Sequence, residues 1–331
     1  MAEMKNIFIT GGAGYIGSHI VKELARRHKL VIFDNLSSGH IESIPEGIKF
    51  VKGDLSNKRL VDKTIKENQI DSVIHLAGSI LVGESVKNPG EYFQNNVVNG
   101  LNLLNAMKNN RVRFIVYSSS AAVYGMPKRV PIKEDHQTYP INPYGATKLM
   151  FEQILKWYDE AYGIRFISLR YFNAAGADPS GEIGEDHKPE THLIPLVLQV
   201  AQGRKEKIEI FGADYKTKDG TCIRDYVHVT DVAKAHMLSL IALSKGKKSS
   251  IYNVSNGKGH SVKEVIEIAR QVTNKKIKTI EVERRPGDPA VLIADSKRIR
   301  KELDWKPRFG DLRQIIKTAW VWHSKNPDGF K

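Results

Sequence analysis

A glycine-rich turn between a strand-like and a helix-like segment is the feature that most limits how this chain can fold. Gly11, Gly14 and Gly17 form a G-x-x-G-x-x-G pattern after the apolar segment 6–10 and at the start of the amphipathic segment 16–27. Glycine is needed where a backbone turns sharply and approaches a pyrophosphate, and the N–H groups at the start of the following helix favour the same anion. The pattern therefore predicts a βα unit that binds a dinucleotide, in preference to a tight turn without a ligand.

The first half of the chain repeats this alternation of short apolar segments with longer amphipathic ones. Strand-like segments cover residues 6–10, 30–33, 48–51, 72–76, 114–117 and 166–169, and helix-like segments cover 16–27, 57–68, 92–108 and 144–162. Short apolar strands joined by helical crossovers are typical of a parallel sheet with helices on both faces. We therefore predict an α/β fold built on a doubly wound parallel (Rossmann) sheet.

The chain changes character after Asn173. A long polar loop at 177–190 is followed by a helix-like segment at 193–202 and a strand-like segment at 208–211. Further helices are expected at 230–244, capped by Thr230 or Asp231, at 262–272 after Ser261, and in the tryptophan-containing tail 312–323. We predict a dinucleotide-binding domain at 1–175, with a return segment near 225–260, and a smaller α/β C-terminal lobe at 176–331 that binds a second ligand.

The charge balance is basic, with 51 Lys and Arg against 37 Asp and Glu and a formal net charge of +14. The basic residues are dispersed, and the densest groups, at 245–248, 275–278 and 297–301, have no interleaved aromatic residues for base stacking. We therefore expect no nucleic-acid partner and assign these charges to solvated surface. The resulting positive electrostatic potential also favours the binding of phosphorylated small molecules.

Cysteine content and hydropathy limit which covalent links, metal sites and membrane segments the chain can have. The lone Cys222 excludes an internal disulfide and any site with several cysteine ligands, and we expect no metal. No apolar segment approaches the roughly 18 residues of a membrane span, and the first residues do not resemble a signal peptide. A reducing cytoplasm fits these features.

Three side chains form a candidate catalytic group. Tyr144 and Lys148 are four residues apart, so they share one face if the segment is helical, and a nearby ammonium favours the phenolate of a tyrosine. Ser120 follows the fifth strand-like segment, which places its hydroxyl at the edge where open α/β sheets bind ligands. Together they suit exchange between an alcohol and a ketone: Tyr144 takes the hydroxyl proton, Ser120 donates to the developing carbonyl oxygen, and Lys148 holds the cofactor ribose and lowers the pKa of Tyr144.

Two acidic residues indicate which dinucleotide is bound. Asp34 ends the second strand-like segment, 20 residues after Gly14, where a carboxylate can accept from both adenosine ribose hydroxyls. A carboxylate there would repel a 2′-phosphate, so we predict NAD over NADP. Asp54, after the third strand-like segment, suits a hydrogen bond to the adenine amino group, although Gly-Asp is also ordinary turn chemistry.

Nearly the whole chain resembles the extended short-chain dehydrogenases/reductases, and within them the UDP-glucose 4-epimerase family. The N-terminal stretches are shared across the superfamily, and those after Asn173 are more specific to the epimerases. The stretches that carry the resemblance are 11–17, 75–78, 83–85, 92–96, 118–125, 142–145, 169–173, 184–187, 189–195, 219–229, 284–288 and the tail. The resemblance implies one tightly held NAD that is not consumed, and a UDP-hexose whose C4 is oxidised to a 4-keto sugar, turned and reduced on its other face. It also implies a homodimer.

The resemblance also implies which residues contact each ligand, with 176–331 as the UDP-sugar-binding domain. Arg224 and Arg285 would bind the diphosphate, Asp288 a ribose hydroxyl, Asn173 the diphosphate or sugar, and Phe211 the uracil. The remaining expected substrate contacts are Ser120, Tyr144, His192, Leu193, Glu209 and Leu292. The expected cofactor contacts are Gly11, Gly14, Tyr15, Ile16, Gly17, Asp34, Asn35, Ser38, Gly39, Asp54, Leu55, Leu76, Ala77, Gly78, Ile80, Asn95, Ser120, Tyr144, Lys148 and Phe172.

Four positions depart from the pattern of several family members. Ile80 replaces a lysine that contacts the cofactor, Leu76 replaces a phenylalanine beside the nicotinamide, and His192 replaces an asparagine near the substrate phosphate. Leu292 stands where some relatives carry a bulky tyrosine that is thought to exclude N-acetylated sugars. UDP-N-acetylglucosamine and UDP-N-acetylgalactosamine are therefore further candidate substrates.

Three other functions of a chain with these motifs differ in the residues that they require or in their products. A nucleotide-sugar 4,6-dehydratase needs an Asp-Glu pair after its catalytic hydroxyl residue, whereas Ser120 is followed by Ala121 and Ala122. A decarboxylase or a simple sugar reductase shares the Tyr and Lys and differs in its products. A regulator that only senses NAD need not keep Ser120, Tyr144 and Lys148 together.

Overall fold

The central element of the computed structural model is a seven-stranded parallel sheet, with strand order β10-β6-β5-β4-β1-β2-β3. The structure describes residues 4–285 and 287–331, so Met1 to Glu3 and Pro286 lie outside the description. The strands of the sheet are β1 (Asn6–Thr10), β2 (Lys29–Asp34), β3 (Lys49–Lys52), β4 (Ser72–His75), β5 (Phe114–Ser120), β6 (Arg165–Tyr171) and β10 (Ser250–Val254). This is the doubly wound sheet expected from the sequence, with β10 added at the edge beside β6.

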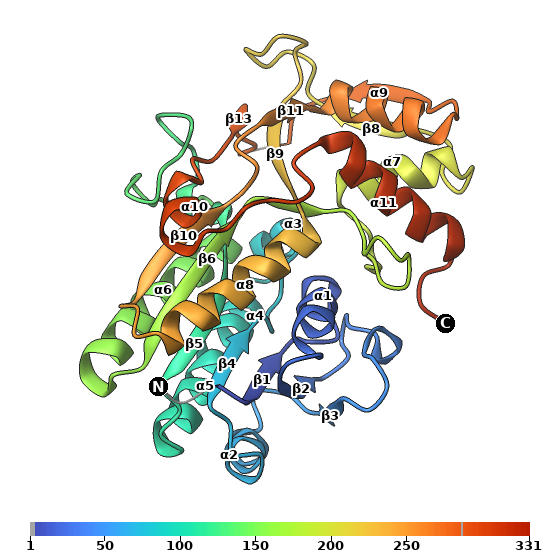
Figure 1. Cartoon of the computed structure of the whole chain (residues 1–331). Helices are drawn as coiled ribbons and strands as arrows, with labels where there is room; N and C mark the ends of the chain where they lie inside the picture. The colour runs from blue at the N-terminus through green and yellow to red at the C-terminus, as the bar shows by residue number, and fades with distance from the viewer. Residues whose placement is uncertain (1–3, 286) are drawn as a thin grey trace.

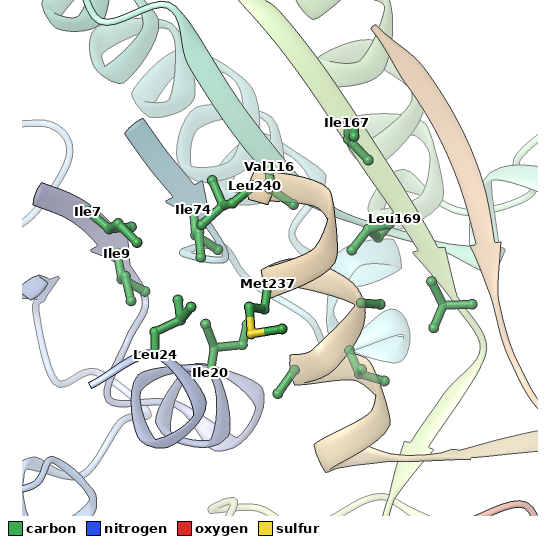
Figure 2. Packing of buried hydrophobic residues seen from close by; sticks show 14 of the residues in the cluster. Ile7, Ile9, Ile20, Leu24, Ile74, Val116, Ile167, Leu169, Met237 and Leu240 are labelled. Carbon is green, nitrogen blue, oxygen red and sulfur yellow. The ribbon is translucent and has the colours of Figure 1, made fainter. Parts of the chain in front are cut away.

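Helices α1 (Tyr15–Leu24) and α8 (Val229–Ser244) cover one face of this sheet (Figure 1). Ile20 and Leu24 of α1 meet Met237 and Leu240 of α8 over the apolar side chains of the strands (Figure 2). The strand residues beneath them include Ile7, Ile9, Ile74, Val116, Ile167 and Leu169. Burying apolar surface at about 25 cal/mol per Å² makes this layer a main source of stability.

The opposite face of the sheet is covered by α2 (Lys58–Glu67), α5 (Asn99–Asn109) and α6 (Pro143–Tyr162). Val61, Leu103 and Phe151 from these helices are fully buried against Phe8 and Ile115 of the strands. Both faces of the sheet are therefore apolar, which explains why its strands read as continuous apolar segments.

A second lobe follows β6 along the chain and lies above the carboxyl edge of the sheet in Figure 1. Helices α7 (Leu193–Ala201), α9 (Val262–Thr273) and α11 (Leu312–Lys325) pack together over β8 (Ile208–Phe211). The other strands of this lobe are β7 (Asn173–Ala175), β9 (Ile223–His228), β11 (Gly259–Ser261), β12 (Thr279–Val282) and β13 (Val291–Leu292). The remaining α-helices are α3 (Val82–Lys87), α4 (Pro89–Phe93) and α10 (Lys297–Leu303), and short 3-10 helices cover Ile41–Ser43 and Ala121–Tyr124.

Two local predictions are wrong. The helix expected at 92–108 is interrupted, because a π-helical turn at Gln94–Val98 separates α4 from α5. The cap of α8 is His228, whose ring nitrogen Nδ1 accepts from the N–H of Thr230, so neither Thr230 nor Asp231 is the cap. The predicted cap Ser261 of α9 is confirmed and forms a reciprocal capping box with Glu264.

Within residues 4–285 and 287–331, no helix is both long enough and apolar enough to cross a bilayer.

Candidate active site

The glycine-rich turn joins β1 to α1 and needs glycine at its first and last positions for steric reasons. Gly11 has φ 72°, and a Cβ there would lie 2.6 Å from the backbone nitrogen of Ala77. A Cβ on Gly17 would lie 2.2 Å from the carbonyl oxygen of Gly11. Both glycines allow a close approach of backbone segments that no side chain would permit.

Gly14 is different, because the protein itself leaves room for a side chain there. A Cβ on Gly14 would meet only the carbonyl oxygen of Gly11, at 3.5 Å, and its φ of −77° suits any residue. Gly14 is also the N-cap of α1 and offers no side-chain cap to the free N–H groups of the helix. The open space and the free donors together fit a pyrophosphate at the helix N-terminus.

Asp34 and Asp54 lie at the ends of β2 and β3, beside this turn. The carboxylate of Asp34 is buried and accepts from the N–H groups of Ala13 (3.0 Å) and Leu36 (2.9 Å), and burial raises its pKa. Asp54 accepts from the side chain of Asn35 at 2.7 Å. Gly39 packs against the turn, where a Cβ would lie 2.9 Å from the carbonyl carbon of Ala13. Segment 34–40 therefore borders the open side of the glycine-rich turn.

The π-helical turn fixes the loop after β4. The side-chain oxygen of Asn96 accepts from the N–H of Ser79 at 2.7 Å, and its amide donates to the hydroxyl of Thr147 at 3.1 Å. Asn95 donates to the hydroxyl of Ser79 at 2.9 Å, and a Cβ on Gly78 would press on Asn96 at 2.9 Å. The turn thus ties loop 76–80 to α6. Asn96 and Thr147 were not among the predicted site residues, because their role depends on this tertiary contact.

Tyr144 lies in the first turn of α6, at the carboxyl edge of the sheet. Pro143 begins the helix, and the side chain of Asn142 caps it by accepting from the N–H of Gly145 at 2.8 Å. Tyr144 is 8% exposed; burial raises the pKa of its phenol, and a hydrogen bond with Ser120 lowers it. The structure therefore brings Tyr144 and Ser120 together, as the sequence predicts.

Lys148 occupies the next turn of α6 and is buried. Its ammonium donates to the carbonyl oxygen of Ser118 at 2.9 Å and lies 5.1 Å from the ring centre of Tyr117 and 5.8 Å from that of Tyr144. Burial lowers the pKa of Lys148 to about 8, and Glu152 acts in the opposite direction. The expected lowering of the Tyr144 pKa by Lys148 is not found in this structure, because burial of the phenol dominates and the ammonium points to Ser118.

A buried ion pair behind Lys148 was missed by the sequence analysis. Glu152, four residues after Lys148, is 1% exposed and binds Arg170 of β6, at 2.9 Å from the guanidinium Nε. Ser119 donates to the same carboxylate at 2.6 Å, and Arg170 also donates to the hydroxyl of Tyr124 at 3.0 Å. The helical spacing of Lys148 and Glu152 was visible in the sequence, but the partner on β6 was not.

Three of the predicted substrate residues, Arg224, Asp288 and Leu292, lie on β9, β13 and the loop before β13. Arg224 forms an ion pair with Asp288, and the pairing of β9 with β13 places Leu292 opposite Arg224. Leu292 also packs against the apolar cluster that contains Ala121 and Phe172, next to Ser120. The structure thus connects the predicted diphosphate end of the site to the catalytic end.

Three of the other predicted substrate residues lie on or beside β8, and Asn173 lies on β7. The guanidinium of Arg285 lies 3.8 Å from the ring centre of Phe211, a separation that suits cation–π attraction. Glu209, on the same strand as Phe211, is exposed, while Asn173 begins β7 and is also exposed. Ile80 is 40% exposed on the loop after β4, so its surface is open to a ligand.

His192 precedes α7 and belongs to a group of alternating histidines and glutamates. Its Nδ1 lies 2.9 Å from carboxylate oxygens of both Glu185 and Glu190, and Leu193 follows it as the first residue of α7. Burial lowers the pKa of His192, but these carboxylates outweigh it and raise the pKa to about 11. The same balance raises the pKa of His187 to about 9.

The fold and the glycine-rich turn are those of a dinucleotide-binding enzyme, and comparison with known proteins shows which family it belongs to. Residues 7–255 match the model of the NAD dependent epimerase/dehydratase family, and the chain belongs to that family. It is 50% identical to the UDP-glucose 4-epimerase of Halalkalibacterium halodurans over 98% of this chain and 97% of that protein.

Solved structures give the same result. The UDP-glucose 4-epimerase from Brucella ovis in complex with NAD is 43% identical, with a TM-score of 0.93 over 96% of this chain and 97% of that one. The UDP-Glc/GlcNAc 4-epimerase from Campylobacter jejuni is 40% identical, with a TM-score of 0.85 over 97% of this chain and 99% of that one.

Proposed function

We propose that this chain interconverts UDP-glucose and UDP-galactose by inverting C4 of the hexose, with one NAD retained through the whole cycle. The assignment is supported by its family and by its 50% identity to a UDP-glucose 4-epimerase over nearly its full length. The observation that carries it is the convergence of Tyr144, Ser120 and Lys148 at the carboxyl edge of the sheet. The adjacent glycine-rich turn is shaped to admit a pyrophosphate at Gly14.

Each catalytic side chain has one role in this reaction. Bound NAD supplies a nicotinamide that accepts a hydride from C4 and later returns it. Tyr144 takes the proton of the C4 hydroxyl as the 4-keto sugar forms, and gives a proton back when the ketone is reduced. Ser120 donates a hydrogen bond to the C4 oxygen, and Lys148 orients the ribose of the cofactor.

The UDP group holds the substrate while the sugar changes face. Arg224 and Arg285 bind the diphosphate, since a guanidinium fork matches phosphate oxygens, and Asn173 adds a neutral donor. Phe211 packs on the uracil and Asp288 accepts from the ribose. Binding energy from this remote part of the substrate allows the 4-keto sugar to turn without leaving.

The test is to incubate the purified protein with UDP-galactose and no added cofactor, and to separate the products. UDP-glucose is expected to appear, because NAD stays bound. Tyr144→Phe should retain NAD yet lose activity by about 10²- to 10⁴-fold, the usual contribution of a general acid–base group. Tyr139→Phe, at a tyrosine that is 73% exposed, is the matched control and should be fully active. A fully active Tyr144→Phe would overturn the assignment of the base.

N-acetylated sugars are a second candidate substrate class. Leu292 is half-buried beside the cluster of Ala121 and Phe172, and it occupies less volume than a tyrosine would. We expect turnover of UDP-N-acetylglucosamine, and we expect Leu292→Tyr to lose it while keeping UDP-galactose turnover. Absence of any N-acetyl turnover in the unmodified protein would remove this candidate.

We propose a homodimer formed through helices of the first domain. Helix α6 exposes Met150, Trp157 and Tyr162, by 43%, 67% and 50%, and Val98 before α5 is 43% exposed. Light scattering after size exclusion should give twice the chain mass of 37.3 kDa. Trp157→Glu should shift the protein toward that single-chain mass.

We propose the cytoplasm as the compartment, because the single Cys222 is buried and free. We propose that residues 1–175, with the return segment near 225–260, bind NAD, and that residues 176–331 bind the UDP-sugar.

A further inference from the structure

Segment 176–192 connects the two lobes and carries a compact group of four side chains, two glutamates and two histidines, of types that bind metals. It lies between α1 and α11 in Figure 1, where Lys22 of α1 binds Asp178 at 2.8 Å and Lys325 of α11 donates to Ser180 at 3.2 Å. Glu185, His187, Glu190 and His192 offer ligand atoms that all lie within 4.8 Å of one another. Among the described residues, 4–285 and 287–331, this is the only such group.

The distances within this group match a tetrahedral metal site. Nδ1 of His192 lies 2.9 Å from oxygens of Glu185 and Glu190, and Nδ1 of His187 lies 3.3 Å and 3.8 Å from oxygens of the same two carboxylates. Zinc–ligand bonds of about 2.0–2.2 Å at tetrahedral angles separate ligand atoms by about 3.3–3.6 Å. The four separations bracket this value, so the two short ones would lengthen slightly and the longest would shorten slightly to complete the polyhedron.

Ion pairs explain His192, whose Nδ1 lies 2.9 Å from both carboxylates, but they leave His187 without a hydrogen bond. Nδ1 of His187 is buried and makes no hydrogen bond, and its carboxylate distances exceed the 2.7–2.9 Å or so of a charge-assisted bond. The rings of His187 and His192 lie 5.1 Å apart, so two protonated imidazoles would repel each other at close range. One divalent cation in their centre would bind both rings in the neutral state and satisfy the unpartnered nitrogen.

The surroundings favour a fixed, water-poor site. Glu185 is 4% exposed, and the ring of Tyr15 lies edge-on to His187 with ring centres 6.2 Å apart. Backbone N–H groups of Thr191 and His192 both donate to Glu190 at 2.7 Å, which holds its carboxylate in place. Supporting contacts of this kind orient metal ligands.

We propose that Glu185, His187, Glu190 and His192 bind one zinc ion that fixes the conformation of residues 185–192. Two imidazole nitrogens with two carboxylates suit zinc better than magnesium or calcium, which prefer sets of six or more oxygens. Four protein ligands leave no open position, so the role of the ion is structural. We expected no metal because the chain has a single cysteine, whereas this group contains only histidines and glutamates.

Zinc would also set the chemistry of His192. Binding through Nδ1 leaves the ring proton on Nε2, so His192 becomes a fixed hydrogen-bond donor. If the proposed epimerase function holds, His192 is one of the expected substrate contacts, so the metal would act on substrate affinity from outside the catalytic group.

The first experiment measures metal on the full-length protein as purified, whether or not it shows epimerase activity. Elemental analysis after dialysis should give about one zinc per chain. X-ray absorption at the zinc edge should show four nitrogen or oxygen ligands at about 2.0–2.1 Å, including two imidazoles. A protein that holds no zinc and binds none from added zinc chloride would overturn the proposal.

The second experiment compares variants. His187→Gln should weaken zinc binding at least tenfold in competition with a chromogenic chelator, while His260→Gln should bind zinc normally. His260 is the control because it has one carboxylate neighbour, Glu264, at 3.9 Å. Undiminished zinc binding by His187→Gln would overturn the site. If that variant fails to fold, the absorption spectrum of the unmodified protein still decides the ligand set.

Discussion

Gly14 lacks a side chain at a position where the rest of the protein would tolerate one. Its neighbours Gly11 and Gly17 are required by contacts of the protein with itself, at 2.6 Å and 2.2 Å from a hypothetical Cβ. The space above Gly14 opens toward the free N–H groups at the start of α1. Single residues of one turn can therefore be separated into those that the fold needs and one that the ligand needs.

This difference predicts contrasting effects of two alanine substitutions. Gly14→Ala should change the free energy of unfolding of the NAD-free protein by less than about 1 kcal/mol, yet the protein should lose its retained NAD. Gly17→Ala should lower the unfolding free energy by several times that amount, because its Cβ collides with the Gly11 carbonyl. Chemical denaturation and the absorbance of released cofactor measure the two effects. Equal NAD retention by Gly14→Ala and the unmodified protein would contradict the assignment of Gly14.

At the scale of elements, α6 carries Tyr144, Lys148 and Glu152 at successive intervals of four residues. These positions share one helix face, which is turned toward β5 and β6. The first residue is at the open edge, the second is buried, and the third is anchored by Arg170. The buried ion pair thus holds the helix in the register that presents Tyr144.

Glu152→Gln should affect both stability and the pH dependence of catalysis. Removing one partner of a buried ion pair costs about 3–5 kcal/mol of unfolding free energy, measurable by chemical denaturation. Because Glu152 raises the pKa of Lys148, its loss should move that pKa below about 8. Because activity needs the Lys148 ammonium, the alkaline limb of the pH–activity profile should then shift to lower pH.

The matched control is Glu23→Gln, which removes the partner of Lys234 from an exposed pair at 3.4 Å. Its unfolding free energy should change by less than about 1 kcal/mol, and its pH profile should not move. An alkaline limb that stays in place in Glu152→Gln would show that Glu152 acts on stability alone.

The elements that could be predicted are those whose signal is local. The strand Asn6–Thr10 and the cap Ser261 follow from adjacent residues, and the proximity of Tyr144 to Lys148 follows from helical spacing. The π-helical turn could not be predicted, because the spacing of its apolar residues continues into α5. It is stabilised by hydrogen bonds of Asn96 with Ser79 and Thr147, which are distant in the sequence. Strand β13 has only two residues and exists through its pairing with β9.

At the scale of the whole molecule, segment 176–192 joins the lobes by contacts with both. Tyr15 of α1 donates to the carbonyl oxygen of Gly176 at 2.6 Å, and Lys22 binds Asp178 and Glu182 at 2.8 Å and 2.7 Å. On the other side, the N–H of Phe330 donates to Asp186 at 3.0 Å. The cofactor turn and the substrate lobe are therefore coupled through one segment without regular secondary structure.

Lys22→Met should loosen this segment without unfolding the sheet. Its ion pairs are partly exposed, so the loss of global stability should stay within about 1 kcal/mol. Hydrogen exchange at residues 177–183 should quicken, while amides of β1 and β4 keep their protection. Lys63→Met, which breaks only an exposed pair with Glu67 within α2, is the control. Unchanged exchange at 177–183 in Lys22→Met would show that the lobes are held by other contacts.

Helix α8 and strand β10 come from residues 229–254, long after the other strands of the sheet have been made. Until they leave the ribosome, Ile20 and Leu24 and the strand side chains beneath α8 have no complete cover (Figure 2). The nascent chain thus exposes a large apolar surface for most of its synthesis. We therefore expect the growing chain to bind chaperones in that interval, and products truncated before residue 229 to aggregate.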